Sequence, residues 1–140
     1  MVFDDGAVSS FNWAGEVSRK DIIDAGLYDN ASYEWLRKPV DVRLGDAVTS
    51  IGNDAFTECT SLKSITIPTS MKSIGDATFD FCTNLTSISI LEGIPAIGEA
   101  AFGRCFNLTN IIMPASVVSI GRDVFFDVSL RSLVFKGKSK

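Results

Sequence analysis

Residues 51–68 read IGNDAFTECTSLKSITIP, and the same pattern returns at intervals of 23 residues. In each copy an Ile-Gly pair is followed by Phe, Cys, Leu and two further apolar residues, mostly Ile, at constant spacing. Copies begin at Ile51, Ile74 and Ile97, and a shortened copy begins at Ile120. A fixed short period is the signature of a solenoid, in which each unit stacks on the next and shares its core.

Each unit predicts a strand, a corner and a short turn. The Ile-x-Ile ending at residues 65–67 alternates with period two, which indicates a strand with its Ile side chains inward. Val48, three residues before the repeat, predicts a second extended segment. Gly52 and its equivalents are expected at a corner with an unusual backbone angle, and residues 53–57 in one helical or 3₁₀ turn.

The chain is predicted to divide into an N-terminal cap, residues 1–45, and four repeats, residues 46–140, of which the last is degenerate. In the cap, Ser18 followed by Asp21 indicates the start of a helix over residues 19–25.

A second cap helix is predicted through Tyr33, and it must end before Pro39. The alternating residues 40–44 are expected to form the first turn of the coil. The large side chains expected to cover the open end of the stack are Phe11, Trp13, Tyr33, Trp35 and Leu36.

Composition and charge narrow the range of functions. The 140 residues are 46% hydrophobic with a mean hydropathy of +0.22, enough for a packed core, and no apolar run is long enough to span a membrane. Residues 1–103 carry 15 acidic and 7 basic side chains, a net charge of −8, whereas residues 104–140 carry 2 and 6, a net of +4. Direct nucleic-acid binding is not expected, because it requires basic clusters.

The sequence predicts no catalytic residue, no metal site and no cofactor. There are no histidines, which removes the common nucleophile systems and the commonest metal ligand. Cys59, Cys82 and Cys105 recur at one inward position and are expected to be buried free thiols. A polar column near the glycine corners is better explained as a solvated edge than as a calcium site.

The units at residues 51–68, 74–90 and 97–114 resemble the BspA-type leucine-rich repeats of many bacterial cell-surface proteins. The resemblance covers about residues 46–136. It implies a leucine-rich repeat solenoid, a curved right-handed coil that is mainly β with short helical or 3₁₀ turns and a small α-helical N-terminal cap. It also implies binding roles, often adhesion to host or matrix proteins.

The outward face of the strands is the predicted binding site. Its two columns are expected to contain Asp41, Ser64, Ser87, Asn110 and Ser132, and Arg43, Thr66, Ser89, Ile112 and Val134. Three aromatic residues outside the strands, Phe81, Phe106 and Phe126, occupy positions that are polar in other repeats. They are expected either to be exposed anchors for a partner or to fold back onto the coil.

The sequence favours a non-catalytic module that recognises another protein through this strand face and the exposed aromatics. The alternative is a small acidic intracellular inhibitor or adaptor, of phage or mobile-element type, that blocks a partner enzyme. The uncovered last repeat predicts a homodimer. The chain shows no signal peptide, so a cytoplasmic location is expected as written, and the cell surface if it is part of a longer protein.

Overall fold

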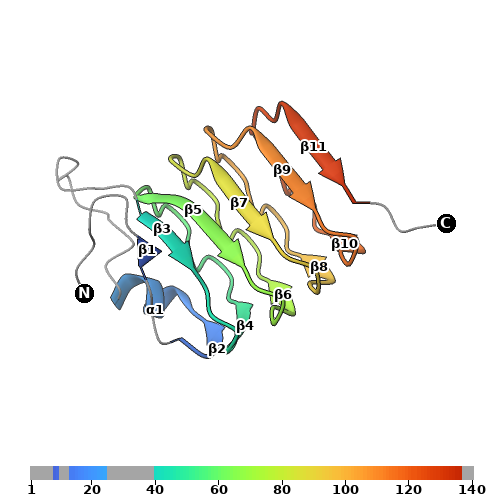
Figure 1. Cartoon of the computed structure of the whole chain (residues 1–140). Coiled ribbons are helices and arrows are strands. Elements are labelled where there is room, and N and C mark those ends of the chain that lie inside the picture. Colours follow the sequence, from blue (N-terminus) through green and yellow to red (C-terminus); the bar gives the residue numbers. More distant parts are fainter. Residues whose placement is uncertain (1–7, 10–12, 25–39, 137–140) are drawn as a thin grey trace.

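The computed structural model describes residues 8–9, 13–24 and 40–136, which form a coil with a period of 23 residues. Each turn of the coil, called a rung below, contributes one strand to a first sheet, a shorter strand to a second sheet, and a turn segment that closes the third side (Figure 1). The described chain begins and ends at opposite ends of the stack. This arrangement confirms the solenoid predicted from the repeat.

The first sheet contains parallel strands β1 (Val8–Ser9), β3 (Val40–Arg43), β5 (Leu62–Ile67) and β7 (Ser87–Ile90). Strands β9 (Asn110–Met113) and β11 (Ser132–Phe135) continue it as a separate pair. Ladder partners lie one repeat apart, as in Ser64 opposite Ser87.

The second sheet contains β2 (Gly15–Val17), β4 (Val48–Ile51), β6 (Ser73–Ile74), β8 (Ala96–Ile97) and β10 (Ser119–Ile120). Strands β1 and β2 precede β3, so the expectation that residues 40–44 form the first rung is wrong. The predicted cap region already pairs with both sheets.

One helix, α1 (Arg19–Asp24), lies at the N-terminal end and confirms the predicted helix start. The Ser18 N–H donates to Asp21 Oδ2 at 2.8 Å, and the Asp21 N–H donates to Ser18 Oγ at 3.3 Å, which is a reciprocal cap. Trp13 is half-buried against the core, as expected for a capping side chain. The second predicted helix and residues Phe11, Tyr33, Trp35 and Leu36 lie outside the described residues.

The third side, called the turn side, consists of residues 53–59 and their equivalents. Here every second N–H donates to the carbonyl 22 residues ahead; the first row, from Asp54, Phe56 and Glu58, has distances of 2.8–2.9 Å. Rows from Ala77 and Ala100 repeat it, so nine bonds all point in the same direction. Asp54 and Glu58 have φ of 58° and 61°, which lie in the left-handed region. The backbone of these turns therefore alternates in hand and is not the predicted helical or 3₁₀ turn.

The physical reason for glycine at the repeated positions differs from the one predicted. Gly52, Gly75, Gly98 and Gly121 lack a positive φ, so the expected corner angle is wrong. Instead, a Cβ at Gly98 would lie 2.6 Å from the carbonyl carbon of Gly75, and one at Gly121 would lie 2.3 Å from the Glu99 nitrogen. At Gly75, Gly98 and Gly121 glycine is required because the backbones of adjacent rungs touch there.

Columns of buried side chains, one member from each rung, fill the coil. Phe56, Phe79 and Phe102 are fully buried and stack with ring centroids 5.3 and 5.5 Å apart. The cysteines lie beside them as buried thiols, and Cys82 Sγ donates to the Phe56 carbonyl at 3.0 Å. Burial raises the pKa of Cys59 and of Cys105 to about 12 and raises the pKa of Cys82 well above its usual value, so all three are protonated at neutral pH.

Candidate protein-binding surface

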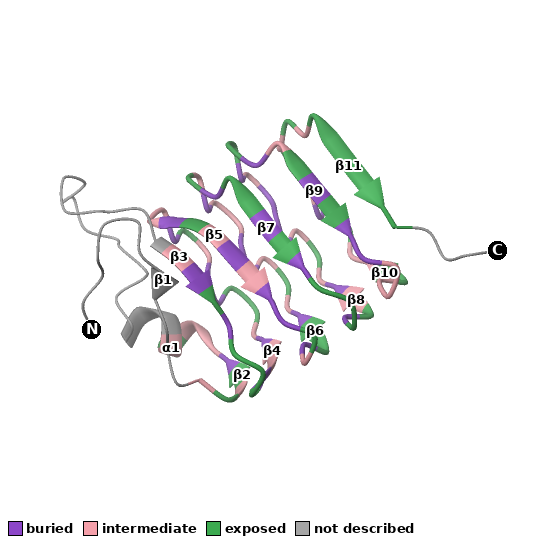
Figure 2. Ribbon diagram, in the orientation of Figure 1, coloured by how far each residue is buried: buried purple, intermediate pink, exposed green. Residues whose placement is uncertain are grey.

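The outward side chains of β3, β5, β7, β9 and β11, called the strand face below, form a continuous surface. Along β7 and β9 burial alternates between exposed and buried residues, so the predicted outward residues do point away from the core (Figure 2). Ladder pairing places Asp41 beside Ser64 and then Ser87, and Asn110 beside Ser132. In the second column, Arg43 lies beside Thr66 and then Ser89, and Ile112 lies beside Val134.

The N-terminal end of the strand face is polar. Ser64 Oγ donates to Asp41 Oδ1 at 2.6 Å, which holds this carboxylate against β5. A small hollow of about 120 Å³ lies here, lined by Asp41, Val42, Arg43, Ser64 and Thr66. Arg43 is exposed beside it. This end offers hydroxyls and charges of both signs.

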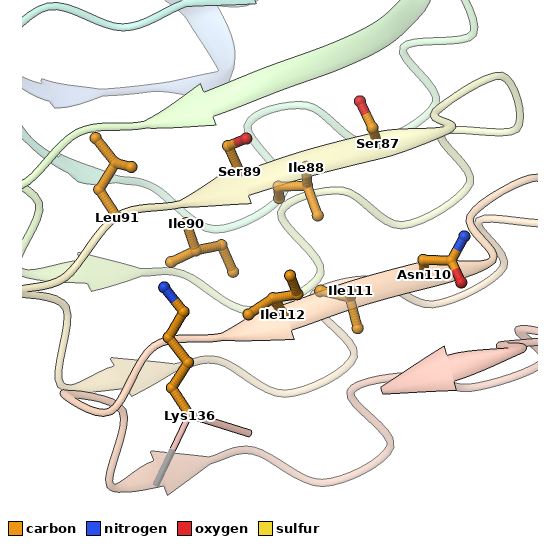
Figure 3. Close-up of a pocket in the computed structure, with 9 residues that line it drawn as sticks. All are labelled: Ser87, Ile88, Ser89, Ile90, Leu91, Asn110, Ile111, Ile112 and Lys136. Carbon is orange, nitrogen blue, oxygen red and sulfur yellow. The ribbon is translucent and has the colours of Figure 1, made fainter. Parts of the chain in front are cut away.

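The C-terminal end of the strand face is apolar, with Ile112 51% and Val134 46% exposed. A larger hollow, of about 280 Å³, lies between β7 and β9 (Figure 3). Its lining is formed by Ser87, Ile88, Ser89, Ile90, Leu91, Asn110, Ile111, Ile112 and Lys136. Sequence reasoning missed Leu91 and Lys136, although both occupy the position at which Pro68 and Pro114 end the other strands, and that exception was a usable signal.

The hollow lies where the first sheet is interrupted. Two backbone hydrogen bonds just outside the paired residues, called flanking bonds here, join β7 to β5, and one of them runs from the Leu91 N–H to the Ile67 carbonyl. The matching bond on β11 runs from the Lys136 N–H to the Met113 carbonyl. Between β9 and β7 the described residues form neither flanking bond. Pro114 accounts for one of them because it has no N–H.

The three aromatic residues lie on the turn side rather than on the strand face. Phe81 is half-buried: the Arg104 guanidinium lies 4.4 Å above its ring, and Phe106 meets it edge-on at 5.9 Å. Arg104 is held by two hydrogen bonds to Asp80, at 3.1 and 2.5 Å. Phe81 therefore packs back onto the coil, whereas Phe106 and Phe126 are 48% and 54% exposed.

The polar side chains near the repeated glycines form hydrogen bonds between adjacent rungs. Asn53 Oδ1 accepts from the Asp76 N–H at 2.7 Å, and Asp76 Oδ1 accepts from the Glu99 N–H at 2.8 Å. Asn84 and Asn107 likewise donate their side-chain amides to carbonyls of the preceding rung, both at 2.6 Å. The predicted solvated edge is thus a ladder of hydrogen bonds between rungs.

The described part of the chain has neither a metal-binding cluster nor a membrane-spanning helix. No group of three or more Cys, Asp or Glu side chains there is arranged to hold a metal ion. None of the helices in that part of the chain has the length and apolar character needed to cross a membrane.

Solved structures of bacterial proteins resemble this chain. A T. pallidum leucine rich repeat protein is 30% identical, with a TM-score of 0.66, and the match covers 80% of this chain and 47% of that protein's chain. A leucine rich cell surface protein of Faecalibacterium prausnitzii is 29% identical with a TM-score of 0.68, covering 91% and 33%. The pneumococcal vaccine antigen PcpA, at 18% identity and a TM-score of 0.61, shares the fold. The chain spans less than half the length of each of these proteins.

A comparison with curated protein sequences gives no match. The family pattern described as the BspA type leucine rich repeat region matches residues 28–140 in six copies. The predicted division at residues 45 and 46 stays a prediction. Leucine-rich repeat proteins typically act as non-catalytic modules that bind other proteins, and no catalytic family is indicated. Because the match covers most of the sequence, this chain belongs to the BspA-type leucine-rich repeat family.

Proposed function

We propose that the chain recognises another protein through its strand face. The observation that carries this proposal is the surface from Arg43 to Val134, on which side chains of paired strands lie in register on either side of the break between β7 and β9. Five strands at a spacing of about 4.8 Å span roughly 20 Å, which suits a peptide segment or a modest protein surface.

The chemistry of this surface changes along the stack. The end near Arg43 and Asp41 is charged and hydroxylic, whereas the end near Ile112 and Val134 is apolar. Partner recognition usually combines a buried apolar anchor with polar contacts around it. We therefore assign the apolar end to affinity and the polar end to orientation of the partner.

Phe106 and Phe126 form a second candidate contact on the turn side. Both rings are about half exposed, and Phe106 is held in place by its edge contact with Phe81. A rigid exposed ring is a favourable anchor because little conformational entropy is lost when it is buried. They would extend the contact beyond the strand face for a partner that wraps around the coil.

The F. prausnitzii relative is described as a cell surface protein, and it covers 91% of this chain. We extend recognition at a cell surface to this chain on that basis. The alternative of an acidic inhibitor receives no support from the comparisons.

The proposal is tested by comparing two substitutions that place the same charge on different sides of the coil. Ile112→Arg alters the strand face, and Val118→Arg alters an exposed apolar residue, 73% accessible, next to the second sheet. Proteins captured by the wild-type chain from its source cells, or from the surface with which those cells make contact, should be lost with Ile112→Arg and retained with Val118→Arg. Equal retention by both variants would exclude the strand face as the binding site.

A further inference from the structure

The hollow between β7 and β9 opens the core of the coil to the strand face. Ile88 and Ile90 on its floor are each 8% exposed, whereas the corresponding Ile65 and Ile67 are 1% and 0% exposed. Ile112 rises beside the hollow and is half exposed. A ligand side chain placed here would cover apolar surface that the interrupted sheet leaves open to water.

A cation lies at one end of this apolar hollow. Lys136 follows β11, and Figure 3 shows its side chain directed toward Ile112 and Ile90. Among the described residues no carboxylate forms an ion pair with it. Ser87 and Asn110 line the hollow farther back along their strands, so its chemistry runs from hydroxyl and amide, through apolar, to cationic.

The size of the hollow indicates the kind of ligand. A volume of about 280 Å³ lies just below the range of roughly 300–1,000 Å³ found for small-molecule sites. It suits one large side chain better than a whole metabolite. The strand face continues past the hollow in both directions, toward Thr66 and toward Val134, so the molecule carrying that side chain can extend across several rungs.

We propose that the hollow binds an internal, extended polypeptide segment in which a large apolar side chain enters between β7 and β9 and a nearby Asp or Glu pairs with Lys136. This deepens the proposed function and rests on it. Charge complementarity supports the acidic partner residue, because residues 104–140 carry a net charge of +4. Main-chain groups of the segment would meet Ser89 and Asn110 on the rim.

The test uses arrays of capped nine-residue peptides with a central Leu or Phe. The peptides form three sets that are otherwise identical. One of the three positions after the central residue carries Asp in the first set, Asn in the second set and Lys in the third set. Fluorescently labelled wild-type protein should bind the Asp set at least fivefold more tightly than the Lys set at 0.15 M salt, and this difference should shrink at 1 M salt. Lys136→Glu should reverse the preference, while the matched control Lys72→Glu, at an exposed residue beside the second sheet, should leave it unchanged.

Equal binding of the Asp and Lys sets, an unchanged preference in Lys136→Glu, or no binding to any apolar peptide would overturn the inference. A requirement for a free peptide C-terminus in uncapped controls would also overturn it, because the carboxylate would then be terminal. If Ile112→Arg abolishes partner capture while Lys136→Glu does not, the strand-face function stands and this inference alone fails. Circular dichroism of each variant verifies that the coil is intact.

Discussion

The two ends of the coil differ in how the rows of backbone hydrogen bonds on the turn side terminate. On the turn side every backbone–backbone hydrogen bond between the described rungs runs from an N–H to a carbonyl of the following rung. Within these rows the described residues therefore supply no backbone donor to the first carbonyls and no backbone acceptor to the last N–H groups. At the N-terminal end Arg19 Nη1 donates to the carbonyls of Asp54, Ala55 and Thr57. At the C-terminal end the described residues provide no acceptor for the equivalent N–H groups of Asp123, Phe125 and Asp127.

One guanidinium therefore takes the place of two of the three row donors at the N-terminal end, those that would meet the carbonyls of Ala55 and Thr57. Arginine suits this position because its planar head carries several donors and stays charged at any relevant pH. The C-terminal end has no such group in the described residues, and its inward-pointing Leu133 and Phe135 are 38% and 55% exposed. Among the described residues, the turn side is therefore closed by Arg19 at one end and open at the other, and the interior rungs depend on contact with both neighbours.

The largest expected effect comes from separating two rungs. Gly98→Ala would place a Cβ 2.6 Å from the Gly75 backbone, which cannot move without shifting a rung. We expect a loss of about 3 kcal/mol in the free energy of unfolding. Gly52→Ala, at the closed end, meets nothing nearer than 3.4 Å and should cost less than about 1 kcal/mol. Urea denaturation of both variants measures the difference; equal losses would contradict the role of rung contact.

Removing the cap is expected to have the next largest effect. Arg19→Ala leaves the three carbonyl groups without their charged donor, and hydrogen bonds to charged groups contribute about 1.5–3 kcal/mol. We expect a loss of about 2 kcal/mol, partly recovered in Arg19→Lys. Lys72→Ala removes the same charge from an exposed residue beside the second sheet and is the control. If both alanine variants melt at the same temperature, Arg19 does not close the stack.

Much of this architecture could be predicted from spacing alone. The period placed Phe79, Cys82 and Ile88 on the inside, and Ser87 and Ile112 on the outside, because inward positions repeat the same residue types. The direction of the turn-side bonds could not be predicted. It depends on positive φ at residues as different as Asp54, Ala77 and Arg104, which share no side-chain feature.

The candidate site was predicted unevenly for a related reason. Alternation in the strands identified the outward side chains, but the break between β7 and β9 depends on two missing bonds, and the sequence explains only the one that Pro114 cannot donate. Phe81 could not be separated from Phe106 by sequence. The contact that covers it comes from Arg104, which is one repeat away and lies in place through its bonds to Asp80.

The buried thiols report whether water is excluded from the core equally well near the two ends of the coil. Burial raises the pKa of Cys59, near the closed end, and of Cys105, nearer the open end, to about 12. Since these pKa values are higher folded than unfolded, the thiols favour folding below about pH 8.5, and this contribution is lost as the pH rises toward 12. Each thiol should lower stability by about 1.4 kcal/mol between pH 9 and 10 at most.

Unfolding measured from pH 8 to 11 should therefore show a shallower decline in Cys59→Ala and Cys105→Ala than in the wild type, by similar amounts. Alkylation at pH 8 should be slow in the folded chain and fast in urea. Rapid alkylation of Cys105 alone would show that the open end admits water to the core.

The smallest effect on stability is expected at the open end itself. Phe135→Ser changes a side chain that is already 55% exposed, so unfolding should change by no more than about 0.5 kcal/mol, against several for a buried ring such as Phe79. The variant should instead change association. An uncovered apolar strand edge favours pairing with another chain, so we expect the wild type to dimerise at high concentration and Phe135→Ser to remain monomeric in sedimentation velocity. A wild type that is monomeric at every concentration would contradict pairing through the last rung, whereas loss of stability without a change in association would mean that Phe135 belongs to the core.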